Sequence, residues 1–279
     1  MLREVLTVLR CPHCGADLAR DERVVRCAQG HAFDIARQGY VNLLPAGARA
    51  GTADTAAMVA ARADFLAADH FAPLSTALAQ QAQQCAPAEK GCVVDIGAGT
   101  GHHLSAVLDA LPGWTGLALD VSKYAMRRAA RCHPRAGAAV CDVWTALPVV
   151  SGAAGLVLDV FAPRNAAEIA RILRPDGALL VVTPQPNHLG EAVTALGLIS
   201  VEPGKLARLD ADLSPLLRLE RRVPLRFTMH LDHAAVATLV GMGPSARHLD
   251  TAVLTERIGA LPVPATVTAA VDIAVYRLA

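Results

Sequence analysis

Residues 93–101 of this chain read Val93-Val94-Asp95-Ile96-Gly97-Ala98-Gly99-Thr100-Gly101. The apolar residues predict a buried strand, and the glycines after it predict a tight turn into a helix. Because glycine has no Cβ, such a turn lets the backbone approach a ligand closely. A second acid, Asp120, follows Leu117-Ala118-Leu119, where the next parallel strand of a βαβ unit should end. A carboxylate at that place can accept hydrogen bonds from ribose hydroxyls, so the two motifs together predict a cofactor that contains a nucleoside.

The spacing of the glycines distinguishes between the known nucleotide-binding loops. The dinucleotide-binding pattern G-x-G-x-x-G needs a glycine at position 102, where this chain has His102. The Gly-Lys-Ser/Thr of a phosphate-binding P-loop does not follow either. What remains is D-x-G-x-G-x-G over residues 95–101, which resembles the cofactor loop of the methyltransferases that use S-adenosylmethionine. The alternative is a glycine turn with a purely structural role.

A second pattern, of cysteine and histidine, lies near the N-terminus. Cys11 and Cys14 are followed by Cys27 and then by His31, in the order C-x2-C-x12-C-x3-H. This is the spacing of a four-ligand zinc site, and four protein ligands leave no position open for catalysis. We therefore predict one structural Zn²⁺ held by these four residues, with His13 as the alternative histidine and chance clustering as the alternative to a metal site. The other cysteines are predicted to be small buried side chains in a reducing cytosol: Cys85, Cys92, Cys132 and Cys141.

The composition is that of a soluble intracellular enzyme. The 279 residues suffice for one large domain with a small appendage, or for two domains. No run approaches the roughly 20 apolar residues of a transmembrane helix. The first residues lack the apolar core and cleavage site of a signal peptide. We therefore expect a cytoplasmic protein that does not contact membranes.

The net charge of +1 disfavours indiscriminate binding to nucleic acid, but basic residues gather in two places. The first cluster contains Lys123, Arg127, Arg128, Arg131 and Arg135. The second contains Lys205, Arg208, Arg218, Arg221, Arg222 and Arg226 and is interspersed with acids. Either cluster could contact RNA or could be a solvated helix face, and the sequence leaves both interpretations open.

From Gly91 onward, strand and helix patterns alternate, which predicts a Rossmann-like α/β fold: a mostly parallel sheet with helices on both faces. The predicted strands span residues 92–96, 116–120, 138–141, 155–160, 178–183 and 267–278, with helices at 56–66, 73–84 and 234–240. Residues 39–55 are predicted to be an irregular connector, and residues 200–230 a polar insertion. We divide the chain into a small N-terminal zinc ribbon (1–38), a connector with helices (39–90) and a class I methyltransferase domain (91–279).

These features resemble one family in particular, the bacterial 23S ribosomal RNA guanine-N1-methyltransferases. The resemblance covers nearly the whole chain and includes the zinc pattern and the glycine loop. It also includes three further segments, Gly39-Tyr40-Val41-Asn42-Leu43-Leu44-Pro45, Leu119-Asp120-Val121-Ser122-Lys123 and Thr183-Pro184-Gln185-Pro186-Asn187-His188-Leu189. The sequence is most similar to the Gram-positive branch, which includes a tylosin-resistance methyltransferase.

The resemblance implies a reaction and its partners. It implies transfer of a methyl group from S-adenosylmethionine to N1 of a guanine, guanine 748, in a hairpin loop of 23S ribosomal RNA. Resistance to tylosin-type macrolides is the implied consequence. A homodimer is also implied.

The resemblance further implies roles for individual residues. The cofactor would be held by Phe71, Asp95, Gly97, Gly99, Thr100, Asp120, Asp142 and His188, with Asp120 on the ribose hydroxyls. Some family members carry glutamate where this chain has Thr100, so the resemblance does not support a need for an acid there. For three of these residues a plainer role is the alternative: Asp95 could cap the following helix, and Phe71 and His188 could only pack.

Methyl transfer to guanine N1 also requires the loss of the N1 proton, and a nearby base would help. His188 and Asp159, each expected at the carboxyl edge of the sheet, are the candidates, and the sequence does not choose between them. Phe161 is expected beside the target base, where its ring could stack on it.

Other functions share parts of this pattern. A small-molecule methyltransferase would have the same domain from Gly91 onward but no obvious need for a zinc ribbon. A non-catalytic zinc-dependent RNA-binding protein would need the ribbon but not the cofactor loop. A protein methyltransferase is a third alternative, although no feature of the sequence suggests a peptide groove.

Overall fold

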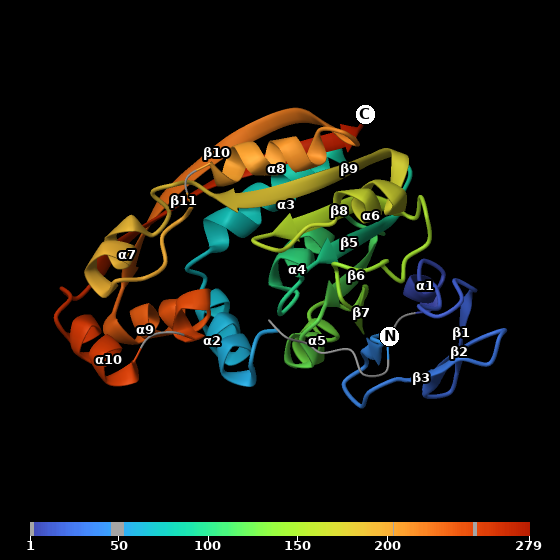
Figure 1. Cartoon of the computed structure of the whole chain (residues 1–279), viewed down its shortest axis with the longest axis horizontal. Helices are drawn as coiled ribbons and strands as arrows, with labels where there is room; N and C mark the ends of the chain where they lie inside the picture. The colour runs from blue at the N-terminus through green and yellow to red at the C-terminus, as the bar shows by residue number, and fades with distance from the viewer. Residues whose placement is uncertain (1–2, 46–52, 203, 248–249) are drawn as a thin grey trace.

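A computed structural model describes residues 3–45, 53–202, 204–247 and 250–279 (Figure 1). The strands are β1 (Leu18–Asp21), β2 (Val24–Cys27), β3 (Ala32–Asp34), β4 (Val41–Asn42), β5 (Cys92–Ile96), β6 (Thr115–Asp120), β7 (Ala136–Val140), β8 (Ala154–Val160), β9 (Leu173–Pro184), β10 (Leu217–Leu231) and β11 (Ala265–Leu278). The helices are α1 (Arg3–Leu6), α2 (Ala56–Ala67), α3 (Ala72–Cys85), α4 (His102–Ala110), α5 (Lys123–Ala129), α6 (Ala166–Ile172), α7 (Gly190–Leu196), α8 (Lys205–Leu213), α9 (His233–Gly241), α10 (Thr251–Gly259) and a short 3₁₀ helix (Pro244–Arg247).

The large sheet has eight strands in the order β10-β11-β9-β8-β5-β6-β7-β4. Strands β4 to β9 pair in parallel, whereas β11 runs antiparallel to both β9 and β10. The parallel strands are buried along most of their length, because helices cover both faces, and this explains their continuous apolar runs. The Rossmann-like sheet expected from the sequence is therefore present.

The connections of the sheet reverse direction at β5. From β5 the chain proceeds to β6 and β7 on one side, and it then returns to β8 on the other side. In open α/β sheets, ligands bind outside the carboxyl ends of the strands at such a switch point. Ile96 is in register with both Leu119 and Asp159, so the ends of β5, β6 and β8 lie level with one another.

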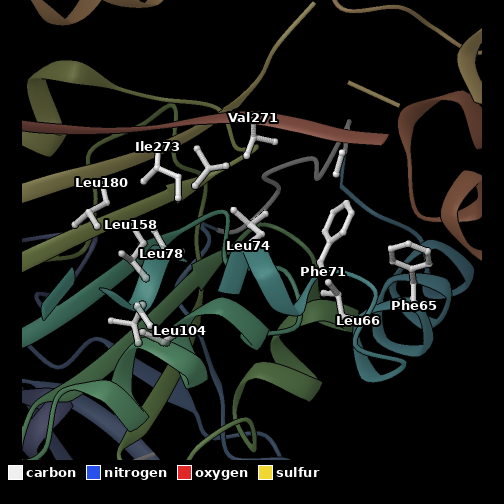
Figure 2. Packing of buried hydrophobic residues seen from close by; sticks show 14 of the residues in the cluster. Phe65, Leu66, Phe71, Leu74, Leu78, Leu104, Leu158, Leu180, Val271 and Ile273 are labelled. Carbon is white, nitrogen blue, oxygen red and sulfur yellow. The ribbon is translucent and has the colours of Figure 1, made fainter. Parts of the chain in front are cut away.

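Each face of the sheet has its own hydrophobic core. On one face, α2, α3, α4 and α9 pack against alternate strand residues, and Figure 2 shows part of this cluster, from Phe65 to Leu180 and Ile273. On the other face, α6, α8 and the N-terminal segment cover the remaining residues. Val93 faces the first core and Val94 the second, as expected for the alternation along a strand.

The N-terminal ribbon is a three-stranded antiparallel sheet, β1-β2-β3. It is attached to the second core, because buried Val25 and Phe33 belong to the same cluster as the residues of that sheet face. Main-chain hydrogen bonds join the segment before the ribbon to residues 148–150, including Arg10 N–H to the Pro148 carbonyl at 2.9 Å.

Two predictions from the sequence are wrong. The connector is not wholly irregular, because Val41 and Asn42 form β4 and pair in parallel with β7. Its residues 46–52 lie outside the described part of the chain. Residues 200–230 are not an insertion: α8 packs on the sheet, and β10 pairs with β11 along its whole length.

The proposed domain boundaries remain an interpretation. Residue 38 follows the ribbon, but β4 and the helices α2 and α3, which precede residue 91, are built into the main sheet and its core. Within the described ranges, no helix combines the length and the apolar character needed to span a membrane.

Candidate functional site

Three aspartates gather at the carboxyl ends of the central strands. Asp95 lies in β5, Asp120 ends β6, and Asp159 lies near the end of β8. Asp95 and Asp159 are buried, with 2% and 0% of their surface exposed. Burial raises the pKa of Asp95 well above its usual value, and the charges of Asp159 and Asp120 raise it further. Asp95 does not cap α4, because the cap position is Gly101 and no side chain hydrogen-bonds there.

Asp120 connects the end of β6 to the glycine loop. Its Oδ2 accepts a hydrogen bond from Gly99 N–H at 3.0 Å, and its Oδ1 accepts one from Ser122 N–H at 2.8 Å. Burial raises the pKa of this carboxyl, and the two backbone donors partly oppose the rise. The acid expected on the ribose is thus fixed in orientation beside the loop that should hold the cofactor.

The glycine loop is shaped by close approaches that a side chain would prevent. Gly97 has a φ of +68°, and a Cβ placed on it would lie 2.5 Å from the Cβ of Ala162 in the segment after β8. Gly99 has a φ of +54°, and a Cβ there would meet only the Arg62 side chain, whose Nη1 would be 3.2 Å away. The loop therefore presents backbone alone toward Arg62, and this cradle fits the expected cofactor.

Two further predicted cofactor residues are Thr100, which lies within the glycine loop, and Asp142, which lies near the end of β7. Thr100 is buried, with 9% of its surface exposed. Asp142 follows β7, and its Oδ1 accepts a hydrogen bond from Trp144 N–H at 3.0 Å. The neighbouring main chain is tied to β6, since Cys141 N–H donates to the Asp120 carbonyl at 3.1 Å.

The predicted cofactor residues Phe71 and His188 come together from distant parts of the sequence. Their ring centroids are 6.5 Å apart, and Phe71 also contacts Phe65 and Phe227 edge-on at 5.3 and 6.0 Å. Phe71 is buried, with 4% of its surface exposed, and Figure 2 shows it between Leu74 and Phe65. Phe71 therefore packs in the core and also lies next to His188.

His188 has a defined tautomer. Its Nδ1 accepts a hydrogen bond from Ala270 N–H at 3.2 Å, so the proton of the neutral ring is on Nε2. Burial lowers the pKa of His188 to about 4, and the Ala270 N–H that occupies Nδ1 also favours the neutral ring. In this tautomer Nδ1 is already occupied and Nε2 carries the proton. The ring can therefore donate a hydrogen bond through Nε2, but it is poorly suited to accept the proton of a substrate.

Asp159 has the opposite character. Its Oδ1 accepts a hydrogen bond from Arg164 Nε at 3.0 Å. Its buried Oδ2 has no hydrogen-bond partner of good geometry within the described residues, although the backbone of Ala162 lies close enough to lower the pKa of the carboxyl. Burial raises the pKa of Asp159 to about 7, although the Arg164 charge opposes the rise. A carboxylate with an unpaired oxygen and a pKa near neutrality is suited to accept a proton.

A cavity of about 410 Å³ opens between the segments that follow β7 and β8 and helix α8, and Arg164, the partner of Asp159, lies at its wall. Trp144 and Phe161 lie at its wall and are 64% and 41% exposed, which is unusual for such large rings. Arg164 and Lys205 also line it. Phe161 is 5.7 Å from His188, centroid to centroid, so its ring lies between the cavity and the His188 side of the site.

The four predicted zinc ligands converge within the ribbon. The ligand atoms of Cys11, Cys14, Cys27 and His31 all lie within 4.8 Å of one another. Cys14 Sγ and Cys27 Sγ are 3.7 Å apart, and His31 Nδ1 lies 3.5 Å from Cys11 Sγ and 3.3 Å from Cys27 Sγ. Tetrahedral Zn²⁺ with bonds of about 2.3 Å to sulfur places its sulfur ligands about 3.8 Å apart, so the arrangement fits this ion.

The alternative ligand His13 is outside this cluster. Its ring stacks on Phe33 at 5.8 Å and contacts the His31 ring at 5.0 Å. At Cys27, burial acts to raise the pKa of the thiol, but hydrogen bonds from the backbone of His31 and Gln29 lower it to about 6. A lowered pKa favours the thiolate, which is the form that binds metal.

The two basic clusters differ in how many of their side chains pair with other groups of the protein. In the first, Arg135 is structural, because its guanidinium donates to the carbonyls of Leu108, Leu111 and Trp114. The other four members lie on or next to α5 with exposed side chains: Lys123, Arg127, Arg128 and Arg131. In the second cluster, three members form ion pairs with acids: Arg208, Arg221 and Arg222.

Sequence reasoning missed three residues of this site: Arg62, Trp144 and Arg164. Arg62 lies on α2, more than thirty positions before the glycine loop, and no motif connects the two. Trp144 follows the predicted acid Asp142 by two positions, so an aromatic residue beside a cofactor motif was the available signal. Arg164 gave no signal, because its role depends on the burial of Asp159.

Comparisons with known proteins show the family of the chain. A family model described as "RlmA, N-terminal", a zinc ribbon, matches residues 9–50. The 23S rRNA (guanine(748)-N(1))-methyltransferase of Streptomyces fradiae is 52% identical over 278 residues and covers 99% of both chains. A relative from Micromonospora griseorubida, provisionally assigned as a 23S rRNA (guanine-N(1)-)-methyltransferase, is 53% identical over 98% of both chains.

A solved structure supports the fold alone. The structure of a provisionally assigned methyltransferase from Bacillus halodurans superimposes with a TM-score of 0.51 at 15% identity, covering 72% of this chain and 97% of that chain. The large domain thus has the class I methyltransferase fold that the sequence predicted. With half of its residues shared over its whole length, the chain belongs to the family of 23S ribosomal RNA guanine-N1-methyltransferases.

Proposed function

We propose that this protein transfers a methyl group from S-adenosylmethionine to N1 of guanine 748 in a hairpin loop of 23S ribosomal RNA. The observation that carries the proposal is the similarity along the entire chain to the relative from Streptomyces fradiae, whose name specifies this reaction. The cofactor cradle at the switch point of the sheet supports it, because Gly99, Asp120 and the Gly97 turn meet there.

We assign the cofactor to the carboxyl edge of β5, β6 and β7. Asp120 accepts hydrogen bonds from the ribose, the glycine loop supports the nucleoside with backbone groups, and Asp142 contacts the adenine. When bound, S-adenosylmethionine supplies an electrophilic methyl group on a sulfonium. His188 donates through Nε2, because its Nδ1 is occupied by Ala270 N–H. Phe71 closes this side of the site as an apolar wall.

In the reaction, the N1–H bond of guanine breaks, an N1–CH₃ bond forms, and the methyl–sulfur bond breaks. We assign the departing proton to Asp159, since its Oδ2 is unpaired and its pKa is about 7. Because the carboxyl is buried, the guanine must displace part of the segment 161–164 to reach it. Most of the acceleration comes from alignment of N1 with the methyl group.

We assign bases of the RNA loop to the cavity lined by Trp144, Phe161 and Arg164. Phe161 and Trp144 are exposed and can stack on unpaired bases, which is how proteins recognise single-stranded RNA. Trp144 is held by two main-chain hydrogen bonds, from its N–H to Asp142 and to its carbonyl from Asn165 Nδ2 at 3.4 Å. These bonds fix the backbone of Trp144 at the wall of the cavity.

The remaining parts of the proposal concern partners and context. Zn²⁺ at Cys11, Cys14, Cys27 and His31 stabilises the ribbon, which contacts RNA. The protein acts in the cytoplasm, where ribosomal RNA is found, and forms a homodimer. Its product confers resistance to tylosin-type macrolides.

The test is to identify the methylated nucleotide. A transcript of the 23S hairpin is incubated with protein and S-adenosylmethionine, followed by primer extension and by mass spectrometry of the nucleosides. We expect a new stop one nucleotide before guanine 748 and a peak of N1-methylguanosine, because a methyl on N1 blocks base pairing. A hairpin in which this guanine is paired should be a poor substrate. Methylation at N2 or N7, or label only in small molecules, would overturn the assignment.

A further inference from the structure

Arg62 is the side chain that covers the open side of the glycine loop. A Cβ built on Gly99 would have two neighbours within 4 Å among the described residues, apart from the adjacent residues of the chain. Both are atoms of Arg62, Nη1 at 3.2 Å and Cδ at 3.5 Å. Arg62 lies on α2, which packs against α9 in the C-terminal part of the chain (Figure 1). Its guanidinium is therefore brought to the cofactor loop by a helix outside the parallel sheet.

The Arg62 guanidinium is held by two partners but has further N–H groups that can donate hydrogen bonds. Its Nη1 pairs with Asp54 Oδ2 at 2.7 Å, and its Nη2 donates to the Met242 carbonyl at 3.0 Å. A guanidinium has five N–H donors, and these two interactions use only two of them. The side chain is 29% exposed, so it can still be reached by a ligand.

Arg62 also shares the electrostatic environment of Asp120. After burial and the two backbone hydrogen bonds, the charges of Asp54 and Arg62 are the next influences on the pKa of Asp120, and they act in opposite directions. The positive charge of Arg62 therefore lies beside the acid that we assign to the ribose. Gly99 contacts both, since its N–H donates to Asp120 and its Cα side faces Arg62 without a side chain between them.

An amino-acid nucleoside matches this arrangement of charges. It offers ribose hydroxyls at one place and an α-carboxylate at another. Guanidinium is the group best suited to a carboxylate, since it can donate two parallel hydrogen bonds to both oxygens. Asp54 and the Met242 carbonyl would keep the fork in place before the ligand arrives, which lowers the entropic cost of binding.

We propose that Arg62 is the carboxylate-binding residue of the cofactor site and that it recognises the α-carboxylate of the methionine part of S-adenosylmethionine. This inference rests on the proposed function, because it requires that the glycine loop bind this cofactor. It adds a residue from α2 to a site otherwise built from the sheet edge and from His188.

The test uses two ligands that differ in the carboxylate. S-adenosylhomocysteine has the α-carboxylate, whereas 5′-methylthioadenosine has the same nucleoside and thioether sulfur without the amino acid. Titration calorimetry measures both affinities for the full-length protein. We expect Arg62→Met to weaken S-adenosylhomocysteine about 10- to 100-fold, the loss of a charged bidentate interaction, and to leave methylthioadenosine within about twofold. Arg62→Lys, which keeps the charge but not the fork, should lie between.

Two further variants separate recognition from support of the fold. Asp54→Asn breaks the ion pair but leaves the guanidinium, so the preference for S-adenosylhomocysteine should persist. Arg23→Met removes an exposed arginine of the ribbon and should change neither affinity. Equal weakening of both ligands by Arg62→Met and Arg62→Lys would overturn the inference and leave Arg62 a structural latch. If the unaltered protein bound neither ligand, the cofactor assignment itself would fail, and the inference with it.

Discussion

At the scale of single residues, Asp159 determines how activity should depend on pH. Its raised pKa of about 7 means that the carboxyl is protonated, and unable to accept a proton, in mildly acidic solution. We expect kcat/KM for RNA methylation to rise with pH up to about 7 and then to level off. Asp159→Asn should lower the rate about 10²- to 10⁴-fold and remove the inflection near 7. Stopped assays between pH 5.5 and 9 measure both effects.

Two controls make this prediction specific. Asp212→Asn alters an acid at the wall of the cavity that Arg164 lines and should leave the inflection in place. Unfolding of the Asp159→Asn variant provides a second, independent readout. A buried acid with a raised pKa stabilises the fold less as pH rises from its unfolded pKa through 7, so the wild type should lose stability from pH 5 to pH 8 through this group. The variant should lack that loss. An unchanged pH profile in Asp159→Asn would assign the proton to another acceptor.

The site residues that could be predicted from the sequence are those whose role depends on their neighbours along the chain. Asp120 was predictable because it directly follows an apolar run, about 20 residues after a glycine turn, and both features can be read from the sequence. Arg62 was not predictable, since its role depends on the contact between its side chain and Gly99. No sequence motif indicates that contact. The sequence likewise could not decide whether His188 or Asp159 accepts the proton. That choice depends on the Ala270 N–H that binds His188 and on the burial of Asp159.

At the scale of elements, the ribbon is where a metal should matter most. Three short strands with few buried side chains hold little core of their own, so the zinc bonds should supply much of the ribbon's stability. We expect one zinc per chain by elemental analysis of native protein. Cys14→Ser and Cys27→Ser should lose it and expose the ribbon to proteolysis, while binding of S-adenosylhomocysteine stays within about twofold, because the cofactor cradle lies at the sheet edge.

Cys85→Ser is the matched control for these variants. Cys85 is buried in α3, away from the four-ligand cluster, and its thiol donates to the Ala82 carbonyl as a hydroxyl could. This variant should keep its zinc. Native protein without zinc, or a Cys14→Ser variant that retains a full equivalent, would contradict the four-ligand site.

The elements that the sequence misjudged lie at the two edges of the large sheet. β10 was taken for an insertion because most of its side chains are partly or fully exposed and many are charged, as expected of an edge strand protected from aggregation. β4 has only two residues and pairs through its backbone, so it has no side-chain periodicity to detect. The central strands were found correctly, since burial on both faces leaves continuous apolar runs.

At the scale of the whole molecule, a net charge of +1 conceals an uneven distribution. Many arginines of the second basic cluster are neutralised by neighbouring acids. The exposed side chains on and next to α5 have no ion pair within the described residues, and Arg127 and Lys123 only lean over the Tyr124 ring, at 5.3 and 5.4 Å. Because α5 packs against α2 and begins shortly after Asp120, this basic face adjoins the cofactor edge. A phosphate backbone that presents a base at that edge would pass over it.

The double variant Arg127→Glu/Arg131→Glu tests this face, since Arg127 lies on α5, Arg131 lies two residues after its end, and both side chains are exposed. We expect RNA affinity at low salt to fall at least about tenfold, and the slope of log K against log salt to become shallower by about two, one for each phosphate that is no longer neutralised. Arg127→Lys/Arg131→Lys keeps both charges and should retain most of the affinity and the slope. Affinity for S-adenosylhomocysteine should be unchanged in both. Filter binding at salt concentrations from about 50 to 300 mM, with calorimetry for the cofactor product, measures these quantities. If the glutamate variant kept the salt slope of the wild type, RNA would bind elsewhere, and if it lost both affinities together, the substitution would have disrupted the fold.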